Sequence, residues 1–247
     1  GISVTGGAQG IGLAYCKGLA AEGAKVVVAD IDKAGSEAAV GELGEAGTDA
    51  LAVVGDVSNP EDTEEMARAT MERFGRIDGL INNAAMFQRP AMSRVPFDEI
   101  PVDEWDRLMA INLRGIFLCC RAVVPEMKRQ QSGKIVNISS GTVFAGTPNL
   151  LHYVTSKAGV IGLTRGLARE LGEYNITVNA IAPGLTMSMD ETDDSQSEYN
   201  QQRIQARSLK RPEAPEDLVG TAVFLCSSDS DFMSGQTMVV DGGLQMH

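Results

Sequence analysis

The stretch ISVTGGAQGIG, residues 2–12, places an apolar run directly before a turn that is rich in glycine. A helical pattern follows from Ile11 to Glu22, so the turn lies between a strand and a helix. Glycines in such a turn let the backbone bend sharply and approach a pyrophosphate closely. The free N–H groups at the start of the helix and the positive end of its dipole favour an anion there. The stretch therefore predicts a dinucleotide-binding turn made by Gly6, Gln9, Gly10, Ile11 and Gly12.

Short apolar runs and longer helical patterns alternate along the rest of the chain. The expected strands are Ile2–Val4, Lys25–Ala29, Ala50–Val54, Gly79–Ile81, Lys134–Ile138, Thr177–Ala180 and Thr237–Val240. The expected helices are Ile11–Glu22, Lys33–Ala46, Pro60–Phe74, Val102–Arg129, Leu151–Tyr174 and Pro215–Ser227. The strands are apolar without alternation, which is typical of parallel strands covered on both faces. We therefore expect an α/β fold with a doubly wound, mostly parallel seven-stranded sheet, formed by one domain over residues 1–247.

One segment departs from this pattern. Met189–Gln202, MDETDDSQSEYNQQ, is polar and acidic, which is typical of a solvated surface. Its position after Pro183 and Gly184 favours instead a substrate lid at residues 185–210.

The second expected strand is followed by Asp30, 18 residues after Gly12. A carboxylate at this distance accepts hydrogen bonds from the 2′-hydroxyl of a ribose, whereas it would repel a 2′-phosphate. Gln9 and Ile31 are neutral, so NAD is favoured over NADP. The alternative is that Asp30 is a turn residue or caps the next helix, which Asp32 could equally do. Further cofactor contacts are expected where other strands end, from Ile31, Asp56, Val57, Asn83 and Ala84.

The composition excludes several classes of partner. A net charge of −12 opposes non-specific binding to nucleic acid or to anionic membranes, and no apolar run approaches the length of a bilayer span. The four cysteines lack metal-binding spacing, and two histidines cannot build a specific metal site. We therefore expect reduced thiols, no metal and a cytoplasmic protein. Because the chain opens directly in an apolar run, we also expect that residues precede Gly1 in the natural protein.

One polar motif ends the fifth expected strand, and a second lies at the start of the helix that follows it. GKIVNISSG, residues 133–141, contains Ser139 and Ser140, and LHYVTSKAG, residues 151–159, carries Tyr153 and Lys157 at helical spacing. A nearby cation moves the pKa of a tyrosine toward neutrality, which suits it to exchange a proton during hydride transfer. A serine at the end of a neighbouring strand can reach the same substrate oxygen. In isolation, the pair could equally be a buried ring beside a solvated lysine.

Taken together, these motifs resemble the compact, single-domain form of the short-chain dehydrogenase/reductase family over essentially the whole chain. The resemblance rests on an ordered set of motifs: Thr5–Gly12, Asn82–Ala84, Asn112, Ser140, Tyr153–Lys157 and Pro183–Thr186. It implies a Rossmann-type fold and an oxidoreductase that uses a nicotinamide cofactor. Ala85 stands where the family often has glycine.

The resemblance also implies a role for each motif residue. Tyr153 would exchange a proton with the substrate oxygen, and Ser140, favoured over Ser139 by the family's spacing, would hydrogen-bond that oxygen. Lys157 would lower the pKa of Tyr153 and hold the nicotinamide ribose, and Tyr153 is also among the expected cofactor contacts. Asn112 would anchor a water that relays protons to Lys157. The cofactor would be held further by Pro183, Gly184 and Thr186.

The expected substrate pocket is largely apolar. Its walls would be Phe87, Ser140, Thr142, Phe144, Leu151, Leu185 and Met189. No arginine or lysine belongs to this set, so a secondary alcohol or ketone with an apolar or aromatic body is favoured, although the same residues could be ordinary core. The helices around Asn112 and Tyr153 are apolar on more than one face, and such helices form subunit interfaces in resembling proteins, so we predict a homotetramer.

Three hypotheses cover the function. The leading one is an NAD-dependent oxidoreductase that interconverts a secondary alcohol and its ketone. The second is an NADPH-dependent 3-oxoacyl thioester reductase, which Asp30 and the acidic net charge disfavour. The third is a non-catalytic nucleotide-binding module, which the intact set of Ser140, Tyr153 and Lys157 disfavours.

Overall fold

The computed structural model describes residues 1–87, 91–186 and 198–246 and forms a seven-stranded sheet in the order β3-β2-β1-β4-β5-β6-β7. Every pairing of neighbouring strands is parallel, so the expected "mostly parallel" sheet is parallel throughout. The strands are β1 (Ile2–Thr5), β2 (Val26–Asp30), β3 (Ala50–Val54), β4 (Gly79–Asn82), β5 (Gly133–Ile138), β6 (Ile176–Pro183) and β7 (Thr237–Val240). All the expected strands are confirmed.

Helices connect these strands. The α-helices are α1 (Gly10–Ala21), α2 (Lys33–Glu45), α3 (Pro60–Phe74), α4 (Val102–Met109), α5 (Gly115–Gln130), α6 (Thr142–Ala145), α7 (Leu151–Leu171), α8 (Glu198–Ala206) and α9 (Glu216–Cys226). Local signals set the bounds of α3: the Asn59 side chain accepts from the N–H of Glu61, Pro60 is the first helical residue, and Gly75 ends the helix with φ +72°.

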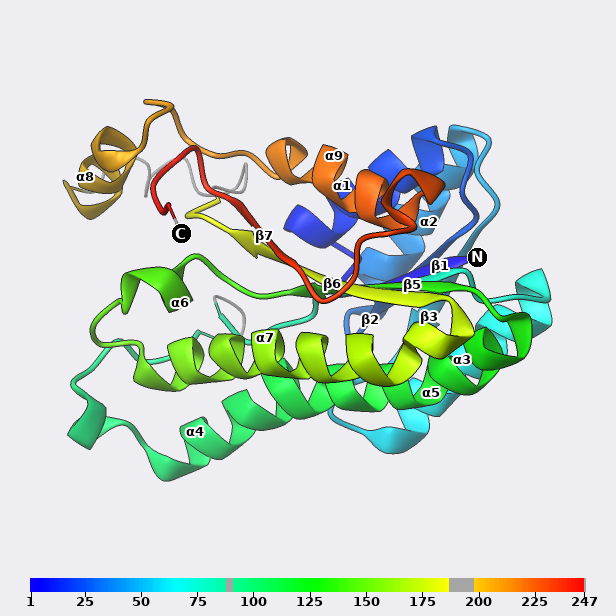
Figure 1. The fold of residues 1–247 in the computed structure, drawn as a ribbon, viewed down its shortest axis with the longest axis horizontal. Helices are drawn as coiled ribbons and strands as arrows, with labels where there is room; N and C mark the ends of the chain where they lie inside the picture. Colours follow the sequence, from blue (N-terminus) through cyan, green and yellow to red (C-terminus); the bar gives the residue numbers. More distant parts are fainter. Residues whose placement is uncertain (88–90, 187–197, 247) are drawn as a thin grey trace.

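The sheet is covered on both faces. Helices α3, α5 and α7 lie on one face, and α1, α2 and α9 lie on the other (Figure 1). Ile116, Val123 and Val160 belong to the core under the first face, whereas Tyr15 and Leu218 belong to the core under the second. Because parallel strands all end at one edge of the sheet, the loops that follow them meet there, and α6 and α8 lie beyond that edge (Figure 1).

The helix expected over Val102–Arg129 differs from the prediction in two ways. A π-helical turn, Ala110–Arg114, separates α4 from α5. The combined segment Val102–Gln130 is also long and apolar enough, by length and composition alone, to cross a membrane, so the expectation that no run approaches this length was wrong. Its residues Cys119 and Val123 are buried against the sheet, which accounts for the apolar composition.

Candidate active site

The turn after β1 is built around glycines whose side-chain positions are already filled. A Cβ atom on Gly12 would lie 1.9 Å from the carbonyl oxygen of Gly6, and one on Gly6 would lie 2.9 Å from Cα of Ala84. Gly6 also has φ +63°, which residues with a side chain rarely adopt. Asn83 closes the turn, because its Nδ2 donates to the carbonyl oxygens of Thr5 and Gly6 at 3.1 Å each. The end of β4 therefore fixes the predicted turn from the side.

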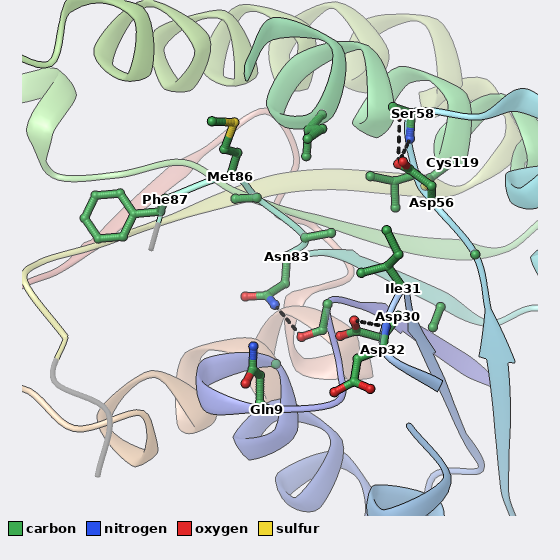
Figure 2. Close-up of a pocket in the computed structure, with 18 of the residues that line it drawn as sticks. Gln9, Asp30, Ile31, Asp32, Asp56, Ser58, Asn83, Met86, Phe87 and Cys119 are labelled. Carbon is green, nitrogen blue, oxygen red and sulfur yellow. Dashed lines mark hydrogen bonds between the residues drawn. The ribbon is translucent and has the colours of Figure 1, made fainter. Parts of the chain in front are cut away.

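The start of α1 faces open space. No described atom lies within 4 Å of the position that a Cβ on Gly10 would take, and Gln9 makes no side-chain capping hydrogen bond within the described part of the chain. A cavity of about 670 Å³ extends from this helix end to Phe87, as Figure 2 shows. An open helix N-terminus in a cavity of this size fits the pyrophosphate of a dinucleotide.

Carboxylates line the side of the cavity away from Phe87. Figure 2 shows Asp30, Asp32 and Asp56 there. Asp30 accepts from the N–H of Ala8 at 3.1 Å and from the N–H of Asp32 at 3.0 Å. Asp32 caps α2, so the helix-capping alternative for Asp30 is settled in favour of Asp32. Asp30 stands at the end of β2 with its carboxylate fixed by backbone donors.

The other predicted cofactor residues are distributed around the same cavity. Its described lining includes the residues expected from the glycine turn and from the ends of β2, β3 and β4: Gly6, Gln9, Gly10, Ile11, Gly12, Asp30, Ile31, Asp56, Val57, Asn83 and Ala84. Thr186 also lines it, whereas Pro183, Gly184, Tyr153 and Lys157 are not among the described lining residues.

Ser140, Tyr153 and Lys157 come together where β5 ends and α7 begins, and all are buried. Ser140 lies close enough to Tyr153 to lower the pKa of its phenol, and its hydroxyl accepts from Thr142 Oγ1 at 2.9 Å. Nζ of Lys157 lies 5.8 Å from the centre of the Tyr153 ring. The neighbouring Ser139 donates instead to the carbonyl oxygen of Lys157 at 2.8 Å, which is a packing contact.

The expected lowering of the Tyr153 pKa is wrong for this structure. Burial raises the pKa of Tyr153 to about 12, and the Ser140 hydrogen bond and the positive charge of Arg94 offset only part of this rise. Burial also lowers the pKa of Lys157 to about 8, because the ammonium loses its hydration. The Lys157 ammonium donates to the carbonyl oxygen of Ile138 at 2.8 Å. The cation that lowers the Tyr153 pKa here is therefore Arg94.

Asn112 lies fully buried in the π-helical turn, and such turns occur often at functional sites. Its Oδ1 accepts from the N–H of Met86 at 2.7 Å, and its Nδ2 donates to Oγ of Ser156 at 3.4 Å. Asn112 thus joins the loop after β4 to the residue before Lys157. The water relay from Asn112 stays a prediction.

Phe87 is the predicted pocket residue that contacts the chemical centre most directly. Its ring centre lies 5.0 Å from that of Tyr153. Leu150 packs in the same cluster with Tyr153, but Leu151 is 46% exposed. Because successive helical residues point in different directions, Leu150 and not Leu151 takes the place expected in the pocket wall.

The remaining pocket predictions have mixed outcomes. Thr142 and Phe144, both in α6, are partly buried, and so is Leu185. Met189 lies outside the described residues, together with the rest of the predicted lid over 187–197. The described part of that lid consists of α8 and the turns that follow it.

Two charged groups at the site were not expected from the sequence. The guanidinium of Arg94 lies 5.8 Å from the centre of the Phe87 ring, which corrects the expectation that no arginine is close to the substrate pocket. Glu213 accepts a hydrogen bond from Oγ1 of Thr186 at 3.1 Å. Neither residue belongs to a recognisable motif, and nothing in the linear pattern indicates that it reaches the site.

His152 adjoins Tyr153 in sequence but serves another contact. It is fully buried, and its Nε2 lies 2.8 Å from Oε1 of Glu104. Glu104 also accepts from the hydroxyl of Ser93 at 2.6 Å. The contact joins α7 to α4 and to the segment that carries Arg94, so His152 has a structural role here.

Comparisons with known proteins agree with this geometry. The family model described as enoyl-(acyl carrier protein) reductase matches residues 6–245. The 3-oxoacyl-(acyl-carrier-protein) reductase FabG of Staphylococcus aureus (strain Mu50) is 38% identical over 247 residues, which cover 98% of this chain and 97% of the relative. The 3-oxoacyl-(acyl-carrier-protein) reductase of a Synechocystis species is 38% identical over 245 residues, 98% of this chain and 96% of the relative.

Solved structures agree as well. The crystal structure of levodione reductase is similar with a TM-score of 0.91 and 34% identity, covering 98% of this chain and 95% of that one. Similarity of this extent, in sequence and in fold, shows that the chain belongs to the short-chain dehydrogenase/reductase family of nicotinamide-dependent oxidoreductases.

Proposed function

We infer that the protein interconverts a secondary alcohol and its ketone with NAD as the cofactor. The observation that carries this proposal is the joint burial of Ser140, Tyr153 and Lys157, with the Lys157 ammonium 5.8 Å from the centre of the Tyr153 ring. These are the groups that a carbonyl reduction needs, namely a proton donor, a second donor to the same oxygen and a nearby cation.

The roles follow from the protonation states. With its pKa raised to about 12, the Tyr153 phenol carries its proton at neutral pH and can donate it to the oxygen of a ketone. Ser140 hydrogen-bonds the same oxygen and orients it. Arg94, whose positive charge lowers the Tyr153 pKa, stabilises the phenolate that is left. Lys157, with a pKa of about 8, is mostly charged at neutral pH and would hold the nicotinamide ribose. When bound, the nicotinamide supplies or accepts the hydride.

The preference for NAD is supported by the charge of the cavity. Asp30, Asp32, Asp56 and Asp62 line it, and Arg107 is the one cation among its described lining residues. A carboxylate-rich wall favours a free ribose hydroxyl over a phosphate. Calorimetric titration of the protein with NAD and with NADP tests this preference, and tighter binding of NADP would contradict it.

The apolar surroundings of Tyr153 support a substrate with an apolar or aromatic body. Met86, Met92 and Leu150 form a buried cluster with Tyr153, and Phe87 packs against them. A second candidate is a 3-oxoacyl thioester reductase, which the names of two similar proteins favour. Turnover of simple aromatic ketones and of an acetoacetyl thioester, measured at equal concentration by nicotinamide absorbance, discriminates between the two candidates.

We further propose a cytoplasmic homotetramer that acts on a small molecule and binds neither nucleic acid nor membrane. Phe117 on α5 is 48% exposed, and an exposed aromatic ring in the uncharged first part of that helix, Gly115–Cys120, supports contact with a second copy. Light scattering at micromolar protein concentration tests this proposal, and a monomer mass would contradict it.

A further inference from the structure

A buried charge pair lies behind the segment that follows β6. Arg207, directly after α8, is 2% exposed, and Glu213 is 4% exposed. Nη2 of Arg207 lies 3.4 Å from Oε2 of Glu213, and Nη1 donates to the carbonyl oxygen of Arg211 at 3.0 Å. Charged side chains are almost never fully buried unless they are paired, and burying them is costly. The contacts that the pair makes with its surroundings must therefore compensate for the cost of burying it.

The pair holds three consecutive residues of the predicted cofactor segment. Glu213 Oε1 accepts from Oγ1 of Thr186 at 3.1 Å, and the two residues also form an isolated parallel β-bridge. Nη2 of Arg207 donates to the carbonyl oxygen of Leu185 at 2.7 Å. A Cβ on Gly184 would lie 2.5 Å from Oε2 of Glu213 and 2.8 Å from Cβ of Asp241, so glycine at this position makes room for both residues. The ion pair therefore contacts the side chain of Thr186, the carbonyl oxygen of Leu185 and the backbone of Gly184.

Thr186 is the member of this segment that reaches the cofactor cavity, which it lines together with Gly6 and Gly12. We propose that Glu213, held by Arg207, is a positioning residue that fixes the hydroxyl of Thr186 at the cavity and thereby couples the end of α8 to cofactor binding. This inference rests on the proposed function, because it requires that a nicotinamide cofactor fills the cavity.

The protonation state of Glu213 determines which group donates in its hydrogen bond with Thr186. Burial raises the pKa of Glu213 to about 7, and the charge of Asp241 adds to the rise, whereas Thr186, Arg207 and the N–H of Gly184 lower it. Tyr15 from α1 and Arg211 also lie within electrostatic reach of Glu213. When ionised, Glu213 accepts a hydrogen bond from the Thr186 hydroxyl, so the lone pairs of that oxygen are free to accept from an amide donor in the cavity.

The direct test is calorimetric titration with NAD between pH 5.5 and 8.5, a range of about 1.5 units on either side of the Glu213 pKa. We expect wild-type affinity to rise as the pH rises through 7 and Glu213→Gln to bind about tenfold more weakly with no such step. Glu216→Gln, which makes the same change at an exposed position three residues away, should keep the wild-type profile.

Thr186→Val keeps the ion pair and tests the same contact if Glu213→Gln fails to fold. It should also weaken binding and abolish the step, and adding Glu213→Gln to it should weaken NAD binding no further. Wild-type affinity and pH profile in Thr186→Val, or in a folded Glu213→Gln, would overturn the positioning role. If the wild-type protein itself did not bind NAD, the proposed function would be refuted instead.

Discussion

Replacement of Asp30 by asparagine should invert the cofactor preference with little change in the shape of the site. Asp30 accepts two backbone hydrogen bonds, from Ala8 and Asp32. Asparagine retains one oxygen acceptor and loses the charge, so one of these contacts is lost and the geometry at the end of β2 is largely kept. The unfolding temperature of the variant reports the structural part of the effect separately.

The expected change in the relative affinity for NAD and NADP follows from two contributions. A hydrogen bond from a ribose hydroxyl to a charged acceptor contributes about 1.5 kcal/mol at the low end of its range, so NAD should bind Asp30→Asn about tenfold more weakly. Two unit charges 4 Å apart near a protein surface repel by about 4 kcal/mol, which is an upper limit for a 2′-phosphate beside Asp30. Because Asp30 is only partly buried, we take about half of this value, so NADP should gain about 30-fold.

The ratio of the two dissociation constants should therefore shift by about 300-fold, the product of these effects. Calorimetric titration with each cofactor measures this ratio without knowledge of the substrate. Asp32→Asn is the matched control, since asparagine also caps helices well and the charge removed lies two residues away. An unchanged ratio in Asp30→Asn, or an equal shift in both variants, would refute the assignment of the ribose contact to Asp30.

Further outcomes follow from the same geometry. Tyr153→Phe should lower turnover by about 10³-fold with NAD affinity unchanged, and full activity would contradict its role as proton donor. Ketone reduction should decline as the pH rises through about 8, where the Lys157 ammonium loses its charge, and Lys157→Met should remove this limb of the pH–rate profile. Arg94→Gln should raise the pKa of Tyr153, so that alcohol oxidation begins at higher pH, whereas Arg94→Lys should keep the wild-type profile. Gly12→Ala should lower the free energy of unfolding by about 3 kcal/mol, because its Cβ would lie 1.9 Å from a carbonyl oxygen, whereas Gly41→Ala, in open space on α2, should not destabilise the fold in thermal denaturation.

The strands and the glycine turn could be predicted because each carries its own local signal. Val26–Asp30 is apolar at nearly every position, which only a strand covered on both faces requires, and it is β2 as expected. Gly6 and Gly12 follow a strand and open a helix, which restricts them to the turn that they form. Helical spacing likewise placed Tyr153 beside Lys157.

The pKa of Tyr153 could not be predicted in the same way. Spacing gives the distance to Lys157, but the pKa depends on how completely the phenol is desolvated and where the ammonium points. Both depend on tertiary packing, in which Phe87 and Leu150 pack against the ring and the carbonyl oxygen of Ile138 accepts a hydrogen bond from the Lys157 ammonium. The charge that lowers the pKa comes from Arg94, which stands in no motif and approaches through a loop.

The reason for a glycine at position 184 could be found only in the folded structure and not in the motif. Within Pro183–Thr186, a glycine suggests a close approach between the backbone and the cofactor. In the structure, a Cβ on Gly184 would lie 2.5 Å from Oε2 of Glu213, 29 residues further along the chain, and 2.8 Å from Cβ of Asp241. The glycine is therefore explained by the chain's own packing at Glu213 and Asp241, and Glu213 also holds Thr186. The sequence pattern does not predict this contact. Glu213 meets the segment after β6 only in the folded chain, where the segment after α8 lies beside it and Arg207 is buried between the two.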